Sequence, residues 1–233
     1  MRILAIETST YSASIALMSQ EGVLGEYYFN IGPSHTEKLV PSIDWLLSEL
    51  NTQKSDLTGV AVSLGPGSFT SLRVGLSTAK GICYSLGIPL VGASSLQALA
   101  MNVPFSSHYI CPVIDARKGE VFTALFKSDN AKLQRVSEDM VISPDALVEI
   151  INDDTIFIGD GALLYREYLE DNLRAGIMFT PLNLNYPRAS NVALSVIDKF
   201  KANLDSNNLY DELMSAAPHY MRKSEAEISR QER

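Results

Sequence analysis

With 233 residues, the chain is long enough for one large domain or two small ones, each with a buried core. A net charge of −8 argues against a broad basic face that holds nucleic acid unaided, although a partner in a complex can supply such a face. No apolar run approaches the roughly 20 residues of a membrane span, and the start leads straight into a strand, unlike a signal peptide. Cys83 and Cys111 lie in apolar contexts without metal-ligand spacing, which is typical of buried thiols in a reducing compartment. We therefore expect a cytoplasmic protein without membrane contact.

Three successive strands are predicted at the start of the chain. Residues 2–7 form an apolar run that ends in an acid, Glu7, and residues 13–18 alternate in polarity after a polar turn. A further turn leads to a third predicted strand at residues 23–30. Because short turns separate the three runs, we expect antiparallel neighbours.

An amphipathic helix is predicted next, over about residues 34–51. Ser34 and Glu37 form a capping box at its start. The apolar residues of one face are Leu39, Val40, Ile43, Leu46, Leu47 and Leu50. Trp45, the only tryptophan, lies on the opposite face with Lys38 and is a candidate anchor for a protein partner. Alternatively, a neighbouring loop of the same chain covers this side chain.

A glycine-rich stretch, Gly65-Pro66-Gly67-Ser68-Phe69-Thr70, joins a predicted strand at residues 60–64 to a helix at residues 70–86. Free N–H groups at the start of that helix can bind a phosphate or a carboxylate. Alternatively, the stretch is a tight connection that holds the helix against a sheet. Within the helix, Ser71, Gly75 and Thr78 form a stripe of small residues, which favours the close approach of another helix.

The second half of the chain repeats the first in outline. Residues 109–115 again form an apolar run that ends in an acid, Asp115, and a turn at Arg117-Lys118-Gly119 leads to a strand at residues 120–126. We interpret this layout as an internal duplication. The other predicted elements are strands at residues 88–92, 132–142 and 155–158, and helices at 94–101, from 143, 161–172 and 189–203.

Two such halves predict a bilobal α/β protein of the actin-like ATPase type, with a ribonuclease-H-like fold in each lobe and a degenerate second lobe. We assign residues 1–105 to the first lobe and residues 106–210 to the second. Residues 211–233 are predicted to form an extended, partly flexible tail, in which residues 218–222 lie along the body of the protein.

Several motifs, in this order, resemble those of the bacterial TsaB (YeaZ) family over essentially the whole chain. They are Ile3-Leu4-Ala5-Ile6-Glu7-Thr8-Ser9-Thr10, Ser34-His35, the stretch from Gly65 to Gly75, Ile114-Asp115-Ala116-Arg117-Lys118-Gly119-Glu120-Val121, Pro218-His219-Tyr220-Met221-Arg222 and Ala226-Glu227. The glycine-rich stretch is the most specific of these motifs.

The resemblance implies a non-catalytic relative of TsaD, the subunit that transfers a threonylcarbamoyl group from threonylcarbamoyl-AMP to N6 of the adenosine just 3′ of the anticodon. Family members are required with TsaD and a TsaE-like ATPase, meet tRNA only through the complex, and need no cofactor of their own. Pairing with TsaD and homodimer formation are both expected through helices of the first lobe. The predicted interface residues are Thr36, Lys38, Trp45, Ser71, Gly75 and Thr78. On this hypothesis, a tryptophan at Gly75 abolishes pairing and leaves the monomer folded.

The sequence departs from the family pattern at two positions, with Glu7 in place of Asp and Ser71 in place of Gly. The longer Glu7 side chain puts a metal-water role in doubt, and Ser71 is expected to change the interface only locally.

Two enzymatic alternatives stay open. In a weakly nucleotide-binding, ATPase-like protein, Glu7, Arg73, Asp115 and Arg117 are the expected anion or nucleotide contacts. The turns after the two acids lack glycine-rich phosphate clamps, which favours acids that merely cap hairpin turns. A glycoprotease-like peptidase is less favoured, because the sequence contains neither His-Glu-x-x-His nor Gly-x-Ser-x-Gly. The three histidines are far apart, so no metal site is predicted.

Overall fold

The alternating and apolar runs of the first half form one mixed five-stranded sheet. The computed structural model describes residues 1–30, 35–130, 132–174, 176–203 and 213–222. The strands of the first sheet are β1 (Ile3–Glu7), β2 (Ser12–Met18), β3 (Val23–Asn30), β4 (Gly59–Gly65) and β5 (Leu90–Ser94), in the order β3-β2-β1-β4-β5. β1 pairs antiparallel with β2, and β2 pairs antiparallel with β3, as the short turns predict. β1 also pairs parallel with β4.

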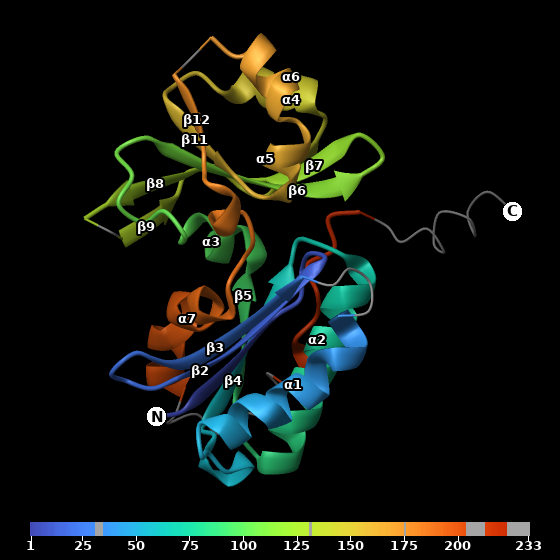
Figure 1. Cartoon of the computed structure of the whole chain (residues 1–233), viewed down its shortest axis with the longest axis vertical. Coiled ribbons are helices and arrows are strands. Elements are labelled where there is room, and N and C mark those ends of the chain that lie inside the picture. Colours follow the sequence, from blue (N-terminus) through green and yellow to red (C-terminus); the bar gives the residue numbers. More distant parts are fainter. Residues whose placement is uncertain (31–34, 131, 175, 204–212, 223–233) are drawn as a thin grey trace, which may run out of the picture.

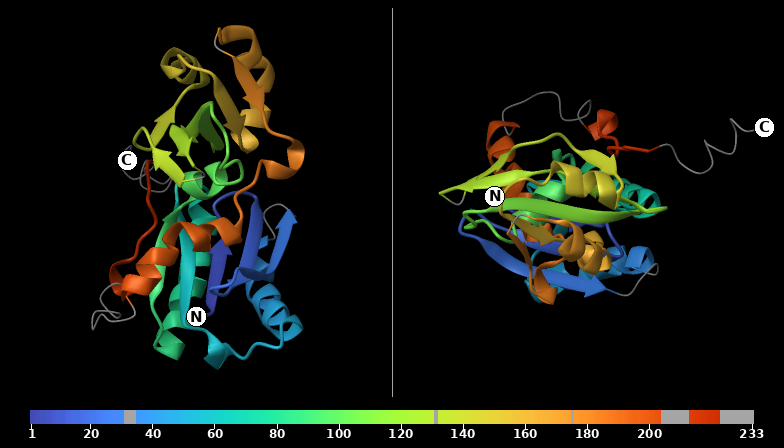
Figure 2. Two further views of the ribbon diagram at one scale, coloured as in Figure 1. Left: turned by 90° about the vertical axis from the view of Figure 1, so that its left-hand side faces the viewer. Right: turned by 90° about the horizontal axis from the view of Figure 1, so that it is seen from above.

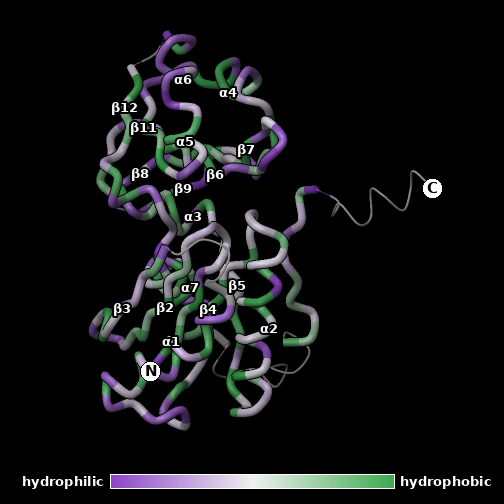
Figure 3. Tube along the Cα trace, turned by 45° about the vertical axis from the view of Figure 1, so that its right-hand side comes forward, coloured by the Kyte–Doolittle hydropathy of each residue, from purple (hydrophilic) through white to green (hydrophobic). Residues whose placement is uncertain are grey.

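Helices cover both faces of this sheet (Figure 1). One face carries α1 (His35–Glu49) and α2 (Phe69–Leu86), whose apolar residues pack with alternate residues of β1, such as Leu4 and Ile6. The opposite face carries α7 (Ala189–Asn203), which packs on Ile3 and Ala5. Figure 3 shows hydrophobic and hydrophilic stretches alternating along α2, as expected of a helix with one buried face.

The position of α7 corrects the predicted lobe boundary. Its range matches the prediction, but its apolar face belongs to the core of the first sheet rather than to the second lobe. Gly59 on β4 leaves room for the Phe200 ring, since a Cβ at this glycine would lie 2.4 Å from a ring carbon. Residues 189–203 are therefore part of the first lobe.

The second sheet repeats the first. Its main strands are β6 (Tyr109–Arg117), β7 (Glu120–Thr123), β10 (Met140–Ile142), β11 (Thr155–Ile158) and β12 (Ile177–Phe179), in the order β10-β7-β6-β11-β12. β6 pairs antiparallel with β7 and parallel with β11, as β1 does with β2 and β4. The internal duplication is confirmed at the level of topology.

The helices of the second lobe are much shorter than α1 and α2. They are α4 (Pro144–Ile150), α5 (Asp160–Leu164) and α6 (Arg166–Asn172), and α3 (Ser95–Ala100) packs on β6 from the junction between the lobes. Ser143 and Ser94 cap α4 and α3, as predicted, by accepting hydrogen bonds from backbone N–H groups. Short 3₁₀ turns at Lys54–Asp56 and Leu182–Leu184 complete the described elements.

Several predictions for the second lobe are wrong in detail. The strand predicted at residues 120–126 is broken after Thr123, because the chain leaves β6 there and returns to it at Ile110 as β8 (Phe126–Asp129). The strand predicted at 132–142 is likewise broken into β9 (Lys132–Arg135) and β10. The helix predicted at 161–172 is interrupted at Tyr165, and the three-residue strand β12 was not predicted.

Val40 is also misplaced by the helical pattern. It was assigned to the buried face of α1, and its side chain is 53% exposed.

Within the described part of the chain, no helix is long and apolar enough to cross a membrane. The left view of Figure 2 shows the second lobe above the first along the long axis, with the N-terminus in the first lobe.

Candidate functional site: the cleft between the lobes and the outer helices

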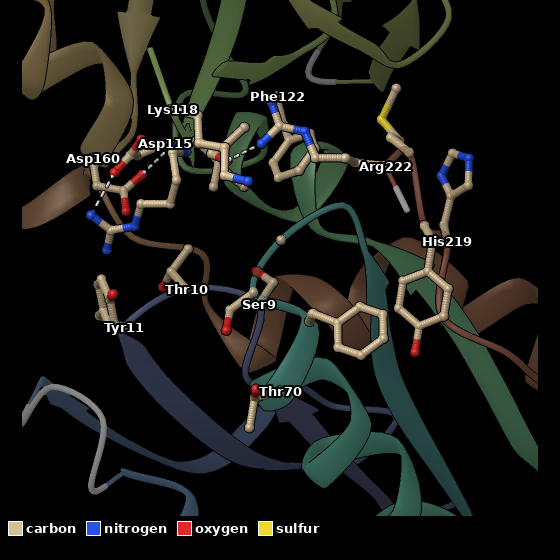
Figure 4. Close-up of a pocket in the computed structure, with 18 residues that line it drawn as sticks. Ser9, Thr10, Tyr11, Thr70, Asp115, Lys118, Phe122, Asp160, His219 and Arg222 are labelled. Atoms are coloured by element: carbon tan, nitrogen blue, oxygen red, sulfur yellow. Dashed lines mark hydrogen bonds and ion pairs between the residues drawn. The ribbon is translucent and has the colours of Figure 1, made fainter. Parts of the chain in front are cut away.

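A cleft of about 460 Å³ lies where the two lobes face each other. Its walls come from the β1–β2 turn, the start of α2, the β6–β7 turn and the segment at residues 219–222. The lining residues used below are Ser9, Tyr11, Asp115, Arg117, Asp160 and Arg222 (Figure 4). Because the two sheets are arranged alike, the strand-end acids Glu7 and Asp115 both lie at this junction.

The glycine-rich stretch packs tightly against the β1–β2 turn. A Cβ on Gly67 would lie only 2.2 Å from the carbonyl oxygen of Ser9, and the same oxygen accepts a hydrogen bond of 2.7 Å from the Ser68 N–H. Ser68 is the N-cap residue of α2 by position, but its Oγ is paired with Ser71 Oγ at 2.9 Å rather than with the backbone. These contacts agree with the tight-connection interpretation of the stretch.

The predicted stripe of small residues does not face outward. Ser71 and Gly75 are buried, and a Cβ on Gly75 would lie 2.2 Å from Thr8 Oγ1, which donates to the Ser71 carbonyl at 2.9 Å. Gly75 therefore allows α2 to approach the β1–β2 turn of its own chain. The prediction that these two residues contact a partner, and that a tryptophan at Gly75 leaves the monomer folded, is wrong for this reason.

The exposed side of α2 carries a different set of small residues. Ser77, Gly81 and Ser85 recur at helical spacing on the solvent side, and no atom of the described residues lies within 4 Å of a Cβ built on Gly81. Tyr84 is 70% exposed beside them, and Thr78 is half-buried.

On α1, Lys38 is exposed. Trp45 is 50% exposed, and the centroid of its ring lies 5.1 Å from that of the Tyr27 ring on β3. Trp45 thus combines both earlier interpretations, because it contacts its own chain and still offers half its surface. Thr36 belongs to the first turn of α1, but its side chain is outside the described residues, as is Ser34. We call the exposed side of the two helices, defined by Val40, Trp45, Ser77, Gly81 and Tyr84, the outer helical face.

Glu7 is closed off at the base of the cleft. It is 1% exposed, and its Oε1 accepts a hydrogen bond of 2.5 Å from the Ser9 N–H. Its Oε2 is buried and has no hydrogen-bond partner in the described part of the chain. Burial raises the pKa of this carboxyl, because removal from water penalises the charged form more than the bonds from Ser9 and Ser63 favour it.

Asp115 is held at the opposite wall. Its carboxylate accepts from the Arg117 N–H at 2.8 Å and pairs with the Arg117 guanidinium at 3.0 Å. That guanidinium also lies over the Tyr11 ring, 4.5 Å from its centroid, so Arg117 reaches across to the first lobe. Asp115 and Arg117 therefore lie together as predicted, although both are already engaged with each other.

Asp160 is a cleft residue that the sequence reasoning missed. One carboxylate oxygen accepts from the Asp115 N–H at 3.2 Å and from the Gly161 N–H at 2.9 Å. Burial raises its pKa from 3.8 to about 6, against the opposing effect of these two hydrogen bonds. The signal that was available is its position, since it follows the end of β11 as Asp115 ends the apolar run of β6.

Arg73 is not among the residues that line the cleft, and its role as an anion contact stays a prediction. Its guanidinium lies 3.9 Å from the centroid of the Phe69 ring, and its Nε donates to Tyr220 Oη at 2.7 Å. The Phe69 and Tyr220 rings are stacked with centroids 4.5 Å apart. The predicted contact of residues 218–222 with the body of the protein is thus confirmed, and Arg73 is part of it.

Comparison with known proteins decides the family. The family model described as "TsaD: tRNA N6-adenosine threonylcarbamoyltransferase" matches residues 22–230. The Bacillus subtilis protein named tRNA threonylcarbamoyladenosine biosynthesis protein TsaB is 33% identical over 231 residues, covering 97% of this chain and 96% of that protein. The chain belongs to the TsaB family.

The structural relatives agree with the TsaB assignment. YeaZ from Pseudomonas aeruginosa has a TM-score of 0.78 at 24% identity, and the match covers 94% of this chain and 99% of that one. The activator of 2-hydroxyisocaproyl-CoA dehydratase from Clostridium difficile, whose structure holds ADPNP, has a TM-score of 0.52 at 11% identity, covering 88% and 97%. The predicted actin-like ATPase fold is confirmed. Membership of the TsaB family also places the chain in tRNA threonylcarbamoyladenosine biosynthesis.

Proposed function

We propose that the chain is an accessory, non-catalytic subunit that pairs with a TsaD-like catalytic subunit. In this role it supports transfer of the threonylcarbamoyl group from threonylcarbamoyl-AMP to adenosine 37 of tRNAs that read codons beginning with A. A TsaE-like ATPase joins the assembly, and the tRNA contacts are supplied by the complex. The net charge of −8 supports this division of labour.

The state of Glu7 is the observation that carries the non-catalytic role. An actin-like ATPase needs an ionised acid at the end of the first strand, facing the cleft, to hold a magnesium ion through water. Glu7 is instead buried, has a raised pKa and is bonded to the Ser9 backbone. Across the cleft, Asp115 is occupied by Arg117. These residues do not fit a magnesium nucleotide.

The outer helical face is the proposed site of pairing. Ser77 and Gly81 on α2 allow a partner helix to approach closely. Trp45, which is 50% exposed, and Tyr84, which is 70% exposed, supply the large rings that anchor protein interfaces. Of the interface residues predicted from the sequence, Trp45 belongs to this face, and Thr36, Lys38 and Thr78 stay predictions. The same face is the proposed contact of a homodimer, so self-association and pairing with the catalytic subunit compete.

The pairing test uses a tryptophan at Gly81. Because no described residue lies within 4 Å of a Cβ at this position, we expect Gly81→Trp to leave the monomer folded. We expect it to lose binding to the TsaD-like subunit and reconstituted tRNA threonylcarbamoylation. The matched control is Asp171→Trp on the exposed side of α6 in the second lobe, which is expected to bind normally. Normal binding by a folded Gly81→Trp variant contradicts the proposed surface.

The non-catalytic role is tested separately on the purified chain alone. We expect no sustained ATP turnover and no casein cleavage. Turnover that disappears in Asp115→Asn refutes the accessory role, whatever the outcome of the pairing experiment.

A further inference from the structure

A short C-terminal segment, residues 219–222, crosses the junction between the two lobes and contacts both of them. Figure 1 shows this segment on the right of the junction, and the chain crossing that leads into α7 on the left; the left view of Figure 2 again shows them on opposite sides. The segment also forms one wall of the inter-lobe cleft.

The contacts with the first lobe are made by Tyr220 and by the backbone of His219. The Tyr220 ring stacks on Phe69, and its hydroxyl accepts from Arg73, both in the first two turns of α2. The His219 N–H donates to the carbonyl of Leu64, at the end of β4, at 2.6 Å. Six residues before His219 the chain is tied to the same lobe, because Leu213 is buried in the core beneath α2.

The contacts with the second lobe alternate with these. His219 Nδ1 lies 3.3 Å from an oxygen of Asp139, which Arg135 also pairs with. Met221 packs on the core cluster of α3 and β6. Arg222 donates to the Ala116 carbonyl at 3.3 Å and forms an ion pair with Glu120 on β7.

The opposite side of the junction is held by a separate network. The side-chain nitrogen of Asn102 donates to the carbonyls of Leu184 and Tyr186, and Asn191 donates to the Asn102 side-chain oxygen at 2.7 Å. These bonds join the two places where the chain passes between the lobes. The chain itself thus links the lobes on this side of the cleft. Among the described residues, the contacts of residues 219–222 hold the other side, and the Arg117 guanidinium lies over the Tyr11 ring between the two.

We propose that residues 219–222 act as a latch that fixes the angle between the lobes. The Asn102 and Asn191 side serves as the hinge, and the cleft opens when Tyr220 leaves Phe69 or Arg222 leaves Glu120. Apart from the packing of Met221, the latch depends on the stacking of Tyr220 on Phe69 and on the partly exposed ion pair between Arg222 and Glu120. Such contacts are individually weak, so a segment of this kind is suited to opening and closing.

The experiment measures the angle between the lobes in the full-length chain without any partner, so its outcome is independent of the proposed pairing. Spin labels are attached to Ser48→Cys on α1 and Glu167→Cys on α6, both exposed positions, and the distance between them is measured by double electron–electron resonance. The native cysteines do not interfere, because both are buried. The parent is expected to give one narrow distance distribution.

In the double variant Tyr220→Ala/Arg222→Ala we expect a broader distribution shifted to longer distances, with the hydrogen-exchange protection of β1 and β6 unchanged. Arg222→Ala alone is expected to give a smaller shift and keeps the measurement possible where the double variant fails to fold. The matched control is Arg166→Ala, which loses a 2.8 Å ion pair with Glu170 and a contact with Phe179 inside the second lobe only. Unchanged distributions in the folded latch variants, or equal broadening in Arg166→Ala, overturn the proposal.

Discussion

Two glycines of α2 are predicted to respond in opposite directions to the same substitution. Gly75→Ala places a methyl group 2.2 Å from Thr8 Oγ1, in a contact that is fully buried on both sides. Gly81→Ala places the same methyl group in open space. The two residues lie in the interior of one helix, so the difference in backbone propensity between Gly and Ala applies to both.

The magnitudes follow from the two environments. Gly81→Ala is expected to stabilise the chain by about 0.5–1 kcal/mol, the intrinsic preference of a helix for Ala over Gly. Gly75→Ala gains the same amount but forces apart a packed contact, at a cost of about 1–3 kcal/mol. It also disturbs the hydrogen bond from Thr8 to the Ser71 carbonyl, which contributes roughly 1 kcal/mol. The net expectation is a loss of about 2 kcal/mol, the sum of these terms.

The assay is urea unfolding followed by circular dichroism, with Thr8→Ala and the double variant Thr8→Ala/Gly75→Ala completing a mutant cycle. Because Thr8→Ala removes the hydroxyl that the new methyl group meets, the double variant should lose about 1–2 kcal/mol less than the sum of the single losses. Additive single and double effects, or a Gly75→Ala variant as stable as Gly81→Ala, refute the inferred contact between α2 and the β1–β2 turn.

Three further outcomes are expected. Asp160→Asn is expected to remove a pH dependence of stability. Burial raises the pKa of Asp160 in the folded state from 3.8 to about 6, so the parent protein is most stabilised below this range. As the pH rises from about 4 to about 6, the parent loses about 3 kcal/mol of unfolding free energy relative to the variant, and it loses no more above that range. Parallel pH profiles of the two proteins in thermal melts contradict this. Phe200→Ala lowers the unfolding free energy by about 3–5 kcal/mol through a cavity under the first sheet, and an exposed control, Lys199→Ala, stays within about 0.5 kcal/mol of the parent. Burial raises the pKa of both thiols to about 12, so Cys83 and Cys111 should resist alkylation at pH 8 in the native protein and react in urea; rapid labelling of the folded chain is the contrary result.

The sequence predicted the range of an element well where the spacing of its apolar side chains fitted only one kind of element. The strands β1 to β4 and the helices α2 and α7 lie within a residue or two of their predicted ranges, because alternation and helical spacing are local properties. The strand predicted at residues 120–126 failed because its break is not local. The chain changes its pairing partner after Thr123, and no pattern within seven residues records that the next strand returns to another part of β6.

Helical spacing could not decide which sheet or which side a helix faces. The core residues Leu72, Leu76 and Ala79 of α2 are flanked on one side by Ser71 and Gly75, and the solvent side carries Ser77 and Gly81. Both sets are small and both recur every four residues, so the sequence offered two equivalent stripes. Only the Thr8 side chain, brought to α2 by the turn after β1, distinguishes them.

The two strand-end acids show that equivalent positions in the duplicated fold need not have the same chemical role. Glu7 and Asp115 occupy equivalent positions in two sheets of the same strand order, yet their surroundings differ. Glu7 is buried away from water, and Asp115 forms an ion pair with Arg117, whose guanidinium lies over the Tyr11 ring of the other lobe. The groups that would bind a nucleotide in an actin-like ATPase are thus used for contacts within and between the lobes. In the proposed accessory role, the cleft keeps a defined inter-lobe geometry, and the proposed pairing surface is the outer helical face rather than the cleft.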